Sequence, residues 1–121
     1  MAKQVLIIDD DNRNIFALKA TLKAKGYECF SALSAQQGIA FLKTNPGIGI
    51  VLIDMMMPDM DGYEAIPKIK SQHPGLPVVS VTAQAMTGDK EKCLAAGADD
   101  YISKPIDVDK LLFILHKYLK S

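Results

Sequence analysis

Val5-Leu-Ile-Ile-Asp-Asp-Asp11 is the stretch that decides the fold, because four apolar residues run straight into three carboxylates. An unbroken apolar run is typical of a strand buried on both faces of a sheet, whereas a strand with one face in water alternates with polar residues. The same form returns at residues 48–53, which Asp54 ends, and at residues 77–81, which Thr82 follows. The sequence therefore predicts several buried strands that each finish in polar side chains.

Helical patterns lie between these runs. Residues 14–25 repeat apolar and small side chains at helical spacing before Gly26, and residues 35–43 follow Ser34, a residue suited to cap a helix. Further helices are expected up to residue 71, over about 87–96 and over 106–119, and further strands over 27–30 and 100–103. Five strands alternating with five helices predict an α/β fold. Its parallel sheet carries helices on both faces, in one domain of residues 1–121.

Composition narrows the class of protein. The chain has 121 residues with 14 basic and 14 acidic side chains, and Arg13 is the single arginine, which argues against a nucleic-acid partner. No apolar stretch approaches a membrane span, and the N-terminus has no signal-peptide pattern, so we expect no membrane partner and a cytoplasmic location. Cys29 and Cys93 lie far apart in apolar surroundings, and we expect both to be buried free thiols.

Polar residues at the strand ends carry the chemistry. Parallel strands bring their carboxyl ends to one edge of the sheet, which is where open α/β sheets bind ligands. This edge is expected to collect the following side chains: Asp9, Asp10, Asp54, Thr82 and Lys104. Crowded carboxylates repel one another unless a cation neutralises them, and an all-oxygen set favours Mg²⁺, with Mn²⁺ as a substitute.

Taken singly, these residues have plainer explanations. The aspartates that follow the first strand could cap a helix, Thr82 is a common strand-end residue, and Lys104 could be a solvated lysine. Asp59 and Asp61, just before Gly62, are expected to serve a turn and a helix cap. The joint placement at one edge is what favours a site.

A metal ion, a lysine and a hydroxyl at one edge suit a phosphoryl group. The sequence has no GxxxxGK[ST] loop, so ATP is not the obvious donor. One carboxylate can then act as the nucleophile and form an aspartyl phosphate.

The chain resembles the receiver domains of two-component response regulators. The resemblance rests on an ordered set of motifs: Leu6-Ile-Ile-Asp-Asp10, Leu52-Ile-Asp54, Met57-Pro-Asp-Met-Asp-Gly62, Val81-Thr-Ala83, Gly97-Ala98 and Lys104-Pro105. It implies a flavodoxin-like, doubly wound sheet of strand order 2-1-3-4-5, as in chemotaxis regulators. Residues 9–18 also resemble receivers of hybrid histidine kinases, so a free-standing regulator and a piece of a larger kinase both stay open.

The resemblance also implies roles in a phosphorelay. Asp54 would be the phosphoacceptor, taking a phosphoryl group from a phosphohistidine of a histidine kinase or histidine phosphotransfer protein. Asp10 and Asp54 would bind Mg²⁺ directly, Asp9 would act through water, and the Met56 backbone carbonyl would add a ligand. Lys104 would pair with the phosphoryl oxygens. Such a phosphoprotein assists its own phosphorylation and dephosphorylation without being a conventional enzyme.

Two further residues would form the switch. Thr82 would turn inward to the phosphoryl group and Tyr101 would follow it, although Tyr101 could instead be a half-buried packing aromatic. The Lys104–Pro105 bond is expected to be cis. An unidentified protein target would read the fourth helix, fifth strand and fifth helix, near these residues: Met86, Lys90, Tyr101 and Lys110.

Two positions depart from the family pattern. Met56 stands two residues after Asp54 and Gln84 two after Thr82, where the resemblance places the path of the hydrolytic water. A thioether holds water poorly, so we expect slower self-dephosphorylation than with a carboxamide at position 56. Met55 and Met57 are expected to fill gaps in the core.

Two other functions remain open. The first strand and its carboxylates also resemble the start of a Mg²⁺-dependent phosphatase of the haloacid dehalogenase type, although the chain is short for one and has Arg13 where that family has threonine. A receiver-like interaction module that never takes phosphate is the other.

Overall fold

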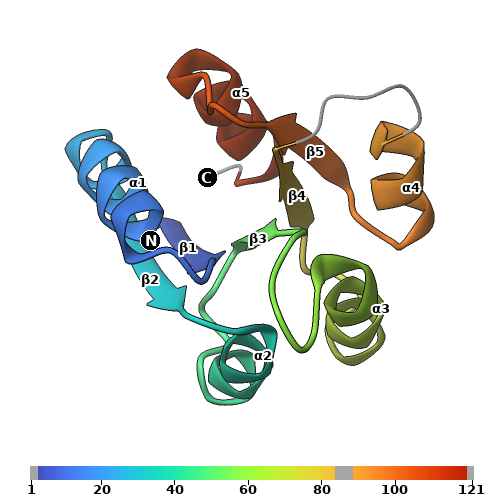
Figure 1. Cartoon of the computed structure of the whole chain (residues 1–121). Helices are drawn as coiled ribbons and strands as arrows, with labels where there is room; N and C mark the ends of the chain where they lie inside the picture. Colours follow the sequence, from blue (N-terminus) through green and yellow to red (C-terminus); the bar gives the residue numbers. More distant parts are fainter. Residues whose placement is uncertain (1–2, 84–88, 120–121) are drawn as a thin grey trace.

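The computed structural model of this chain describes residues 3–83 and 89–119. In these residues five strands alternate with five helices (Figure 1): β1 (Lys3–Ile8), α1 (Asn12–Ala24), β2 (Tyr27–Ala32), α2 (Ala35–Thr44), β3 (Ile50–Asp54), α3 (Gly62–Gln72), β4 (Val78–Thr82), α4 (Asp89–Ala95), β5 (Asp100–Ser103) and α5 (Val108–Tyr118). The predicted alternation is confirmed, with boundaries that move by a few residues. The start expected for the fourth helix, near residue 87, lies outside the described residues.

All neighbouring strands are parallel, in the order β2-β1-β3-β4-β5. This is the order that the resemblance implied. The register pairs Ile8 with Ile53, Asp54 with Val81 and Thr82 with Ser103. The carboxyl ends of β1, β3, β4 and β5 therefore meet at one edge of the sheet.

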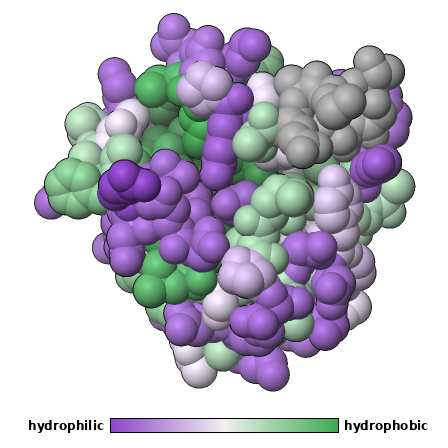
Figure 2. Space-filling model, in the orientation of Figure 1, coloured by the Kyte–Doolittle hydropathy of each residue, from purple (hydrophilic) through white to green (hydrophobic). Residues whose placement is uncertain are grey.

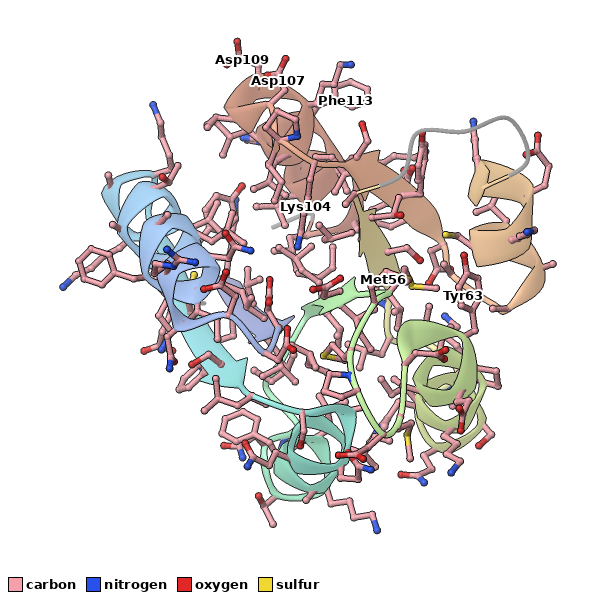
Figure 3. The ribbon with its side chains drawn as sticks, in the orientation of Figure 1. Met56, Tyr63, Lys104, Asp107, Asp109 and Phe113 are labelled. Atoms are coloured by element: carbon pink, nitrogen blue, oxygen red, sulfur yellow. The ribbon has the colours of Figure 1, made fainter. Side chains whose placement is uncertain are left out.

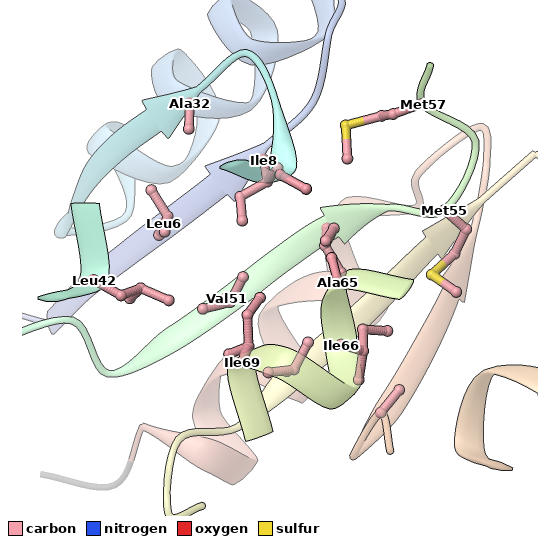
Figure 4. Close-up of a cluster of buried hydrophobic side chains, with 14 of the residues drawn as sticks. Leu6, Ile8, Ala32, Leu42, Val51, Met55, Met57, Ala65, Ile66 and Ile69 are labelled. Carbon is pink, nitrogen blue, oxygen red and sulfur yellow. The ribbon is translucent and has the colours of Figure 1, made fainter. Parts of the chain in front are cut away.

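The strands are apolar on both sides because helices cover both faces of the sheet. Val5 and Ile7 point to the face covered by α1 and α5, and Leu6 and Ile8 point to the face covered by the other three helices. Figure 4 shows the second of these cores, in which Leu6 and Ile8 of β1 belong to the same cluster of buried side chains as Ile66 of α3. Complete burial of such a side chain contributes about 1.5–3 kcal/mol, so the two cores fix the sheet in place.

Local residues begin and end the helices as their chemistry predicts. The Ser34 hydroxyl accepts from the Gln37 N–H at the start of α2, and the Asp61 carboxylate accepts from the Glu64 N–H at the start of α3. Gly26 follows α1 with a φ of 91°, a backbone conformation that glycine adopts freely. The cap expected of Asp61 is confirmed, and Asp59 lies in the turn before it with a φ of 67°.

The two cysteines are free, but only one is buried. Cys93 lies in the core, whereas Cys29 is half-buried, so the expectation of two buried thiols is wrong for Cys29. The reason is the strand order, which leaves β2 at the edge of the sheet. Partial burial still raises the pKa of the Cys29 thiol. Among the described residues, no helix is long and apolar enough to cross a bilayer.

Candidate functional site

The predicted site residues meet at the carboxyl edge of the sheet. Asp9 directly follows β1, Asp54 and Thr82 are the last residues of β3 and β4, and Lys104 directly follows β5. Figure 3 shows the Lys104 side chain pointing into the middle of this edge. Figure 2 shows hydrophilic side chains gathered near the centre of the same view, between hydrophobic patches. The fold therefore brings together residues that are far apart in sequence.

Three carboxylates form a cluster at this edge. Asp9, Asp10 and Asp54 each offer an oxygen, and these oxygens lie within 4.8 Å of one another. Asp9 and Asp54 are 4% and 7% exposed, whereas Asp10 is exposed. A cluster with two buried members and one open side suits a hard divalent cation that keeps some of its water, so the residues present fit Mg²⁺.

Burial raises the pKa of the Asp9 carboxyl group. Its nearness to Asp54 adds to the increase, while the Asp11 N–H, which donates to Asp9 Oδ1 at 2.9 Å, and the Lys104 ammonium oppose it. A side-chain hydrogen bond with Asn14 also lowers this pKa. The net increase means that the site holds negative charge at a cost, which a bound cation would remove.

Lys104 and the backbone of Met56 hold the two oxygens of Asp54. Lys104 Nζ lies 3.3 Å from Asp54 Oδ2, and the Met56 N–H donates to Asp54 Oδ1 at 3.0 Å. The Lys104 N–H donates to the Thr82 carbonyl at 2.7 Å, and the Lys104–Pro105 bond is cis, as the resemblance implied. The two ends of the Asp54 carboxylate are therefore fixed by different parts of the chain.

Thr82 and Tyr101 lie on neighbouring strands. Thr82 is buried, and Tyr101 is half-buried against the core under α2, α3 and α4. The packing contact that the plainer explanation of Tyr101 requires is thus present, and its role as a switch stays a prediction. Lys90 and Lys110 are exposed on α4 and α5, while Met86 and Gln84 lie outside the described residues.

Three consecutive methionines follow β3, and they differ in their exposure to solvent. Met55 and Met57 are buried in the core, which confirms their expected gap-filling role, whereas Met56 is exposed.

Sequence reasoning missed Asn14 as a neighbour of the site. Asn14 lies in α1 and borders a groove of about 310 Å³ with Leu18 and Val108, and this groove opens onto Asp9 and Lys104. The sequence signal for Asn14 is weak, because a polar residue in the first turn of a helix is ordinary. Only the packing of α1 beside β1 brings Asn14 to the carboxylates.

Comparison with known proteins adds independent findings. The family described as the response regulator receiver domain matches residues 5–116. The heme response regulator HssR of Staphylococcus haemolyticus is 35% identical over 95% of this chain, and the chain covers 50% of that protein. The sensor histidine kinase RcsC of Salmonella typhi is 39% identical over 94% of this chain, and the chain covers 12% of it. The chain therefore spans half or less of these two relatives.

A solved structure matches the whole chain. The receiver domain of the sensor histidine kinase PA1611 from Pseudomonas aeruginosa PAO1 is 29% identical, with a TM-score of 0.89 and complete coverage of both chains. That structure is described with a magnesium ion coordinated in its active-site cleft. The likeness supports the fold and the sheet order.

Proposed function

Because the chain belongs to the response regulator receiver domain family, we propose that Asp54 accepts a phosphoryl group from a phosphohistidine of a histidine kinase or histidine phosphotransfer protein. One observation carries this proposal: Asp54 is a buried strand-end carboxylate with Lys104 Nζ at 3.3 Å and two more carboxylates beside it. In the transfer, an Asp54 oxygen attacks phosphorus, the P–N bond breaks, and the histidine keeps the electron pair. The receiver domain is proposed to span residues 1–121.

Mg²⁺ is the proposed cofactor, and Mn²⁺ would take the same ligands. Asp10 and Asp54 would bind it directly, Asp9 would act through water, and the Met56 carbonyl would complete the protein's share. The cluster of three carboxylates supports this, as does the magnesium described for the PA1611 receiver. When bound, the ion neutralises charge on the transferred phosphoryl group.

Lys104 and Thr82 would hold the phosphoryl oxygens. Lys104 already reaches Asp54, so its ammonium would move onto the added charge, and the Thr82 hydroxyl would donate a hydrogen bond. Phosphorylation adds close to two negative charges and shifts the population between two surfaces. Tyr101 would follow Thr82 and alter the surface of α4, β5 and α5, which an unidentified protein target reads. The domain thus acts as a switch and not as a conventional enzyme, and its cytoplasmic location stays a prediction.

Intact-mass spectrometry after incubation with acetyl phosphate and Mg²⁺ tests the proposal. The wild type should gain one phosphoryl mass, and Asp54→Asn should not. Asp59→Asn is the matched control, since it changes an exposed aspartate in the neighbouring turn, where the positive φ suits asparagine. Labelling of Asp54→Asn would contradict the assignment.

The same experiment separates the alternatives. A wild type that stays unlabelled by acetyl phosphate and by phosphohistidine donors would favour an interaction module that never takes phosphate. Steady turnover of a small phosphate ester that is lost in Asp9→Asn but kept in Asp54→Asn would favour the phosphatase.

A further inference from the structure

Met56 offers a sulfur atom to solvent, whereas its two neighbours in sequence do not. Met56 is 62% exposed as a whole residue, while Met55 is 0% and Met57 8% exposed. Figure 4 shows Met55 and Met57 among the buried side chains of the core, and Figure 3 shows Met56 at the edge of the sheet that carries Lys104. A small polar oxidant in solvent therefore reaches Met56 without any opening of the structure.

Met56 is also tied to the proposed phosphoacceptor. Its N–H donates to Asp54 Oδ1 at 3.0 Å, so the Met56 backbone holds one of the two oxygens that could carry the phosphoryl group. A change in the chemistry of the Met56 side chain therefore takes place on a residue whose backbone contacts Asp54. The buried side chains of Met55 and Met57 fill the core instead.

We propose that peroxide oxidises Met56 and that the resulting sulfoxide shortens the lifetime of the phosphoryl group on Asp54. The first part is a modification site, and the second part rests on the proposed function. The sulfur lone pair attacks one oxygen of hydrogen peroxide, and the S–O bond forms as the O–O bond breaks. The proton on the transferred oxygen passes to the departing hydroxide, which leaves as water. Sulfur loses two electrons and the peroxide gains them.

The sulfoxide changes how the Met56 side chain treats water. A thioether is a weak hydrogen-bond acceptor, but a sulfoxide oxygen is a polar one that can hold a water molecule. Water removes the phosphoryl group by attacking phosphorus, and the P–O bond to Asp54 breaks to give inorganic phosphate and the free carboxylate. A water held next to Asp54 is closer to this attack, so hydrolysis speeds up. Because sulfoxide reductases reverse the oxidation, the change is a reversible one.

Peptide mapping after limited hydrogen peroxide treatment tests the modification site. In the folded protein, Met56 should oxidise about tenfold or more faster than Met55 and Met57, because buried sulfurs react only when the structure opens. In urea the three rates should converge. Equal oxidation rates of the three methionines in the folded protein would contradict Met56 as the selective oxidation site.

The phosphoryl lifetime tests the consequence. After removal of peroxide and labelling with acetyl phosphate, the oxidised wild type should lose phosphate about threefold faster than the untreated protein, the effect expected of one hydrogen bond to the attacking water. Peroxide should leave the rate of Met56→Leu unchanged, whereas Met60→Leu, a matched change in the same loop, should respond like the wild type.

Two further outcomes separate the effect on the phosphoryl lifetime from the proposed function. Selective oxidation of Met56 with no change in lifetime would overturn the regulatory part. Failure of the untreated wild type to label would instead contradict the proposed function, and the peptide map would still decide whether Met56 is the modification site.

Discussion

Lys104 Nζ lies 3.3 Å from Asp54 Oδ2, and this contact joins residues 50 positions apart in the chain. The same ammonium lies 3.8 Å from Asp9 Oδ2, so one cation stands between two buried carboxylates from different strands. The Lys104 side chain is 24% exposed, which leaves the group partly in contact with water. Lys104 therefore partly balances the negative charge of the site in the protein without metal.

Replacement of Lys104 by methionine should destabilise the protein when no divalent cation is present. Asp9 and Asp54 would then face each other without the ammonium, and loss of a partner from a mostly buried pair costs about 1–3 kcal/mol after allowance for the exposed part of the lysine. Urea unfolding in EDTA at pH 7 measures this. Lys68→Met, on the exposed side of α3, is the control, and an equal effect in both variants would contradict the role of the pair.

Asp9→Asn should stabilise the metal-free protein at neutral pH. Burial raises the folded-state pKa of Asp9 above its value of 3.8 in the unfolded chain, so the folded state binds the proton more tightly. Ionised Asp9 therefore lowers the free energy of unfolding progressively as the pH rises from 3.8 through the folded pKa, and the full cost is present above it. The neutral amide removes that cost and still accepts the Asp11 N–H.

The pH dependence of this gain is the check on the Asp9 prediction. The gain from Asp9→Asn in EDTA should be present at pH 7 and should vanish at about pH 2.5, well below the unfolded-state value of 3.8, where wild-type Asp9 is protonated in both states. Asp11 is the internal contrast, because the Arg13 N–H lowers the pKa of its carboxyl group. Ionised Asp11 therefore stabilises the folded state, whereas ionised Asp9 destabilises it. A gain that is the same at both pH values would show that Asp9 ionisation is not its cause.

Mg²⁺ should raise the stability of the wild type, because it binds the folded carboxylate cluster and not the unfolded chain. At ten times its Kd the gain is about 1.4 kcal/mol. Asp10→Asn should lose most of this gain with little change in the metal-free protein, since Asp10 is exposed and its replacement leaves the core intact. Thermal unfolding in MgCl₂ and in NaCl of equal ionic strength measures the difference, and equal gains in both proteins would remove Asp10 from the metal site.

The site residues could be predicted from the sequence because of where the strands stop. An apolar run that stops at Asp9 or Asp54 marks a strand end, and recognising it requires no knowledge of the loop that follows. The parallel topology then brings these strand ends to one edge of the sheet. The strand order itself came from the resemblance. The expectation that Cys29 is buried rests on its apolar neighbours in sequence alone, and it does not use the edge position of β2 that the implied strand order contains.

Burial of Met55 and Met57 is predicted from the sequence and confirmed, but the exposure of Met56 is not predicted, for a different reason. Met55, Met56 and Met57 are chemically identical, and only the packing of α3 against the end of β3 buries two of them and exposes the third. Asn14 is a similar case, since it reaches the site through the position of α1 and not through any motif.

Gly62→Ala should test how tightly α3 holds the end of β3. A Cβ on Gly62 would lie 2.9 Å from the Met55 Cα, and the Gly62 N–H already donates to the Met55 carbonyl at 3.2 Å. Because the obstacle includes backbone, the loop must move, at a cost of about 1–3 kcal/mol, and the movement would disturb the Met56 N–H that holds Asp54. We expect lower stability in urea together with slower labelling by acetyl phosphate.

Gly75→Ala is the contrast, because no described atom lies within 4 Å of its Cβ, and this variant should gain about 0.4–1 kcal/mol of stability with unchanged labelling. If Gly62→Ala were as stable and as quickly labelled as Gly75→Ala, the close contact between α3 and Met55 would not be what positions Asp54.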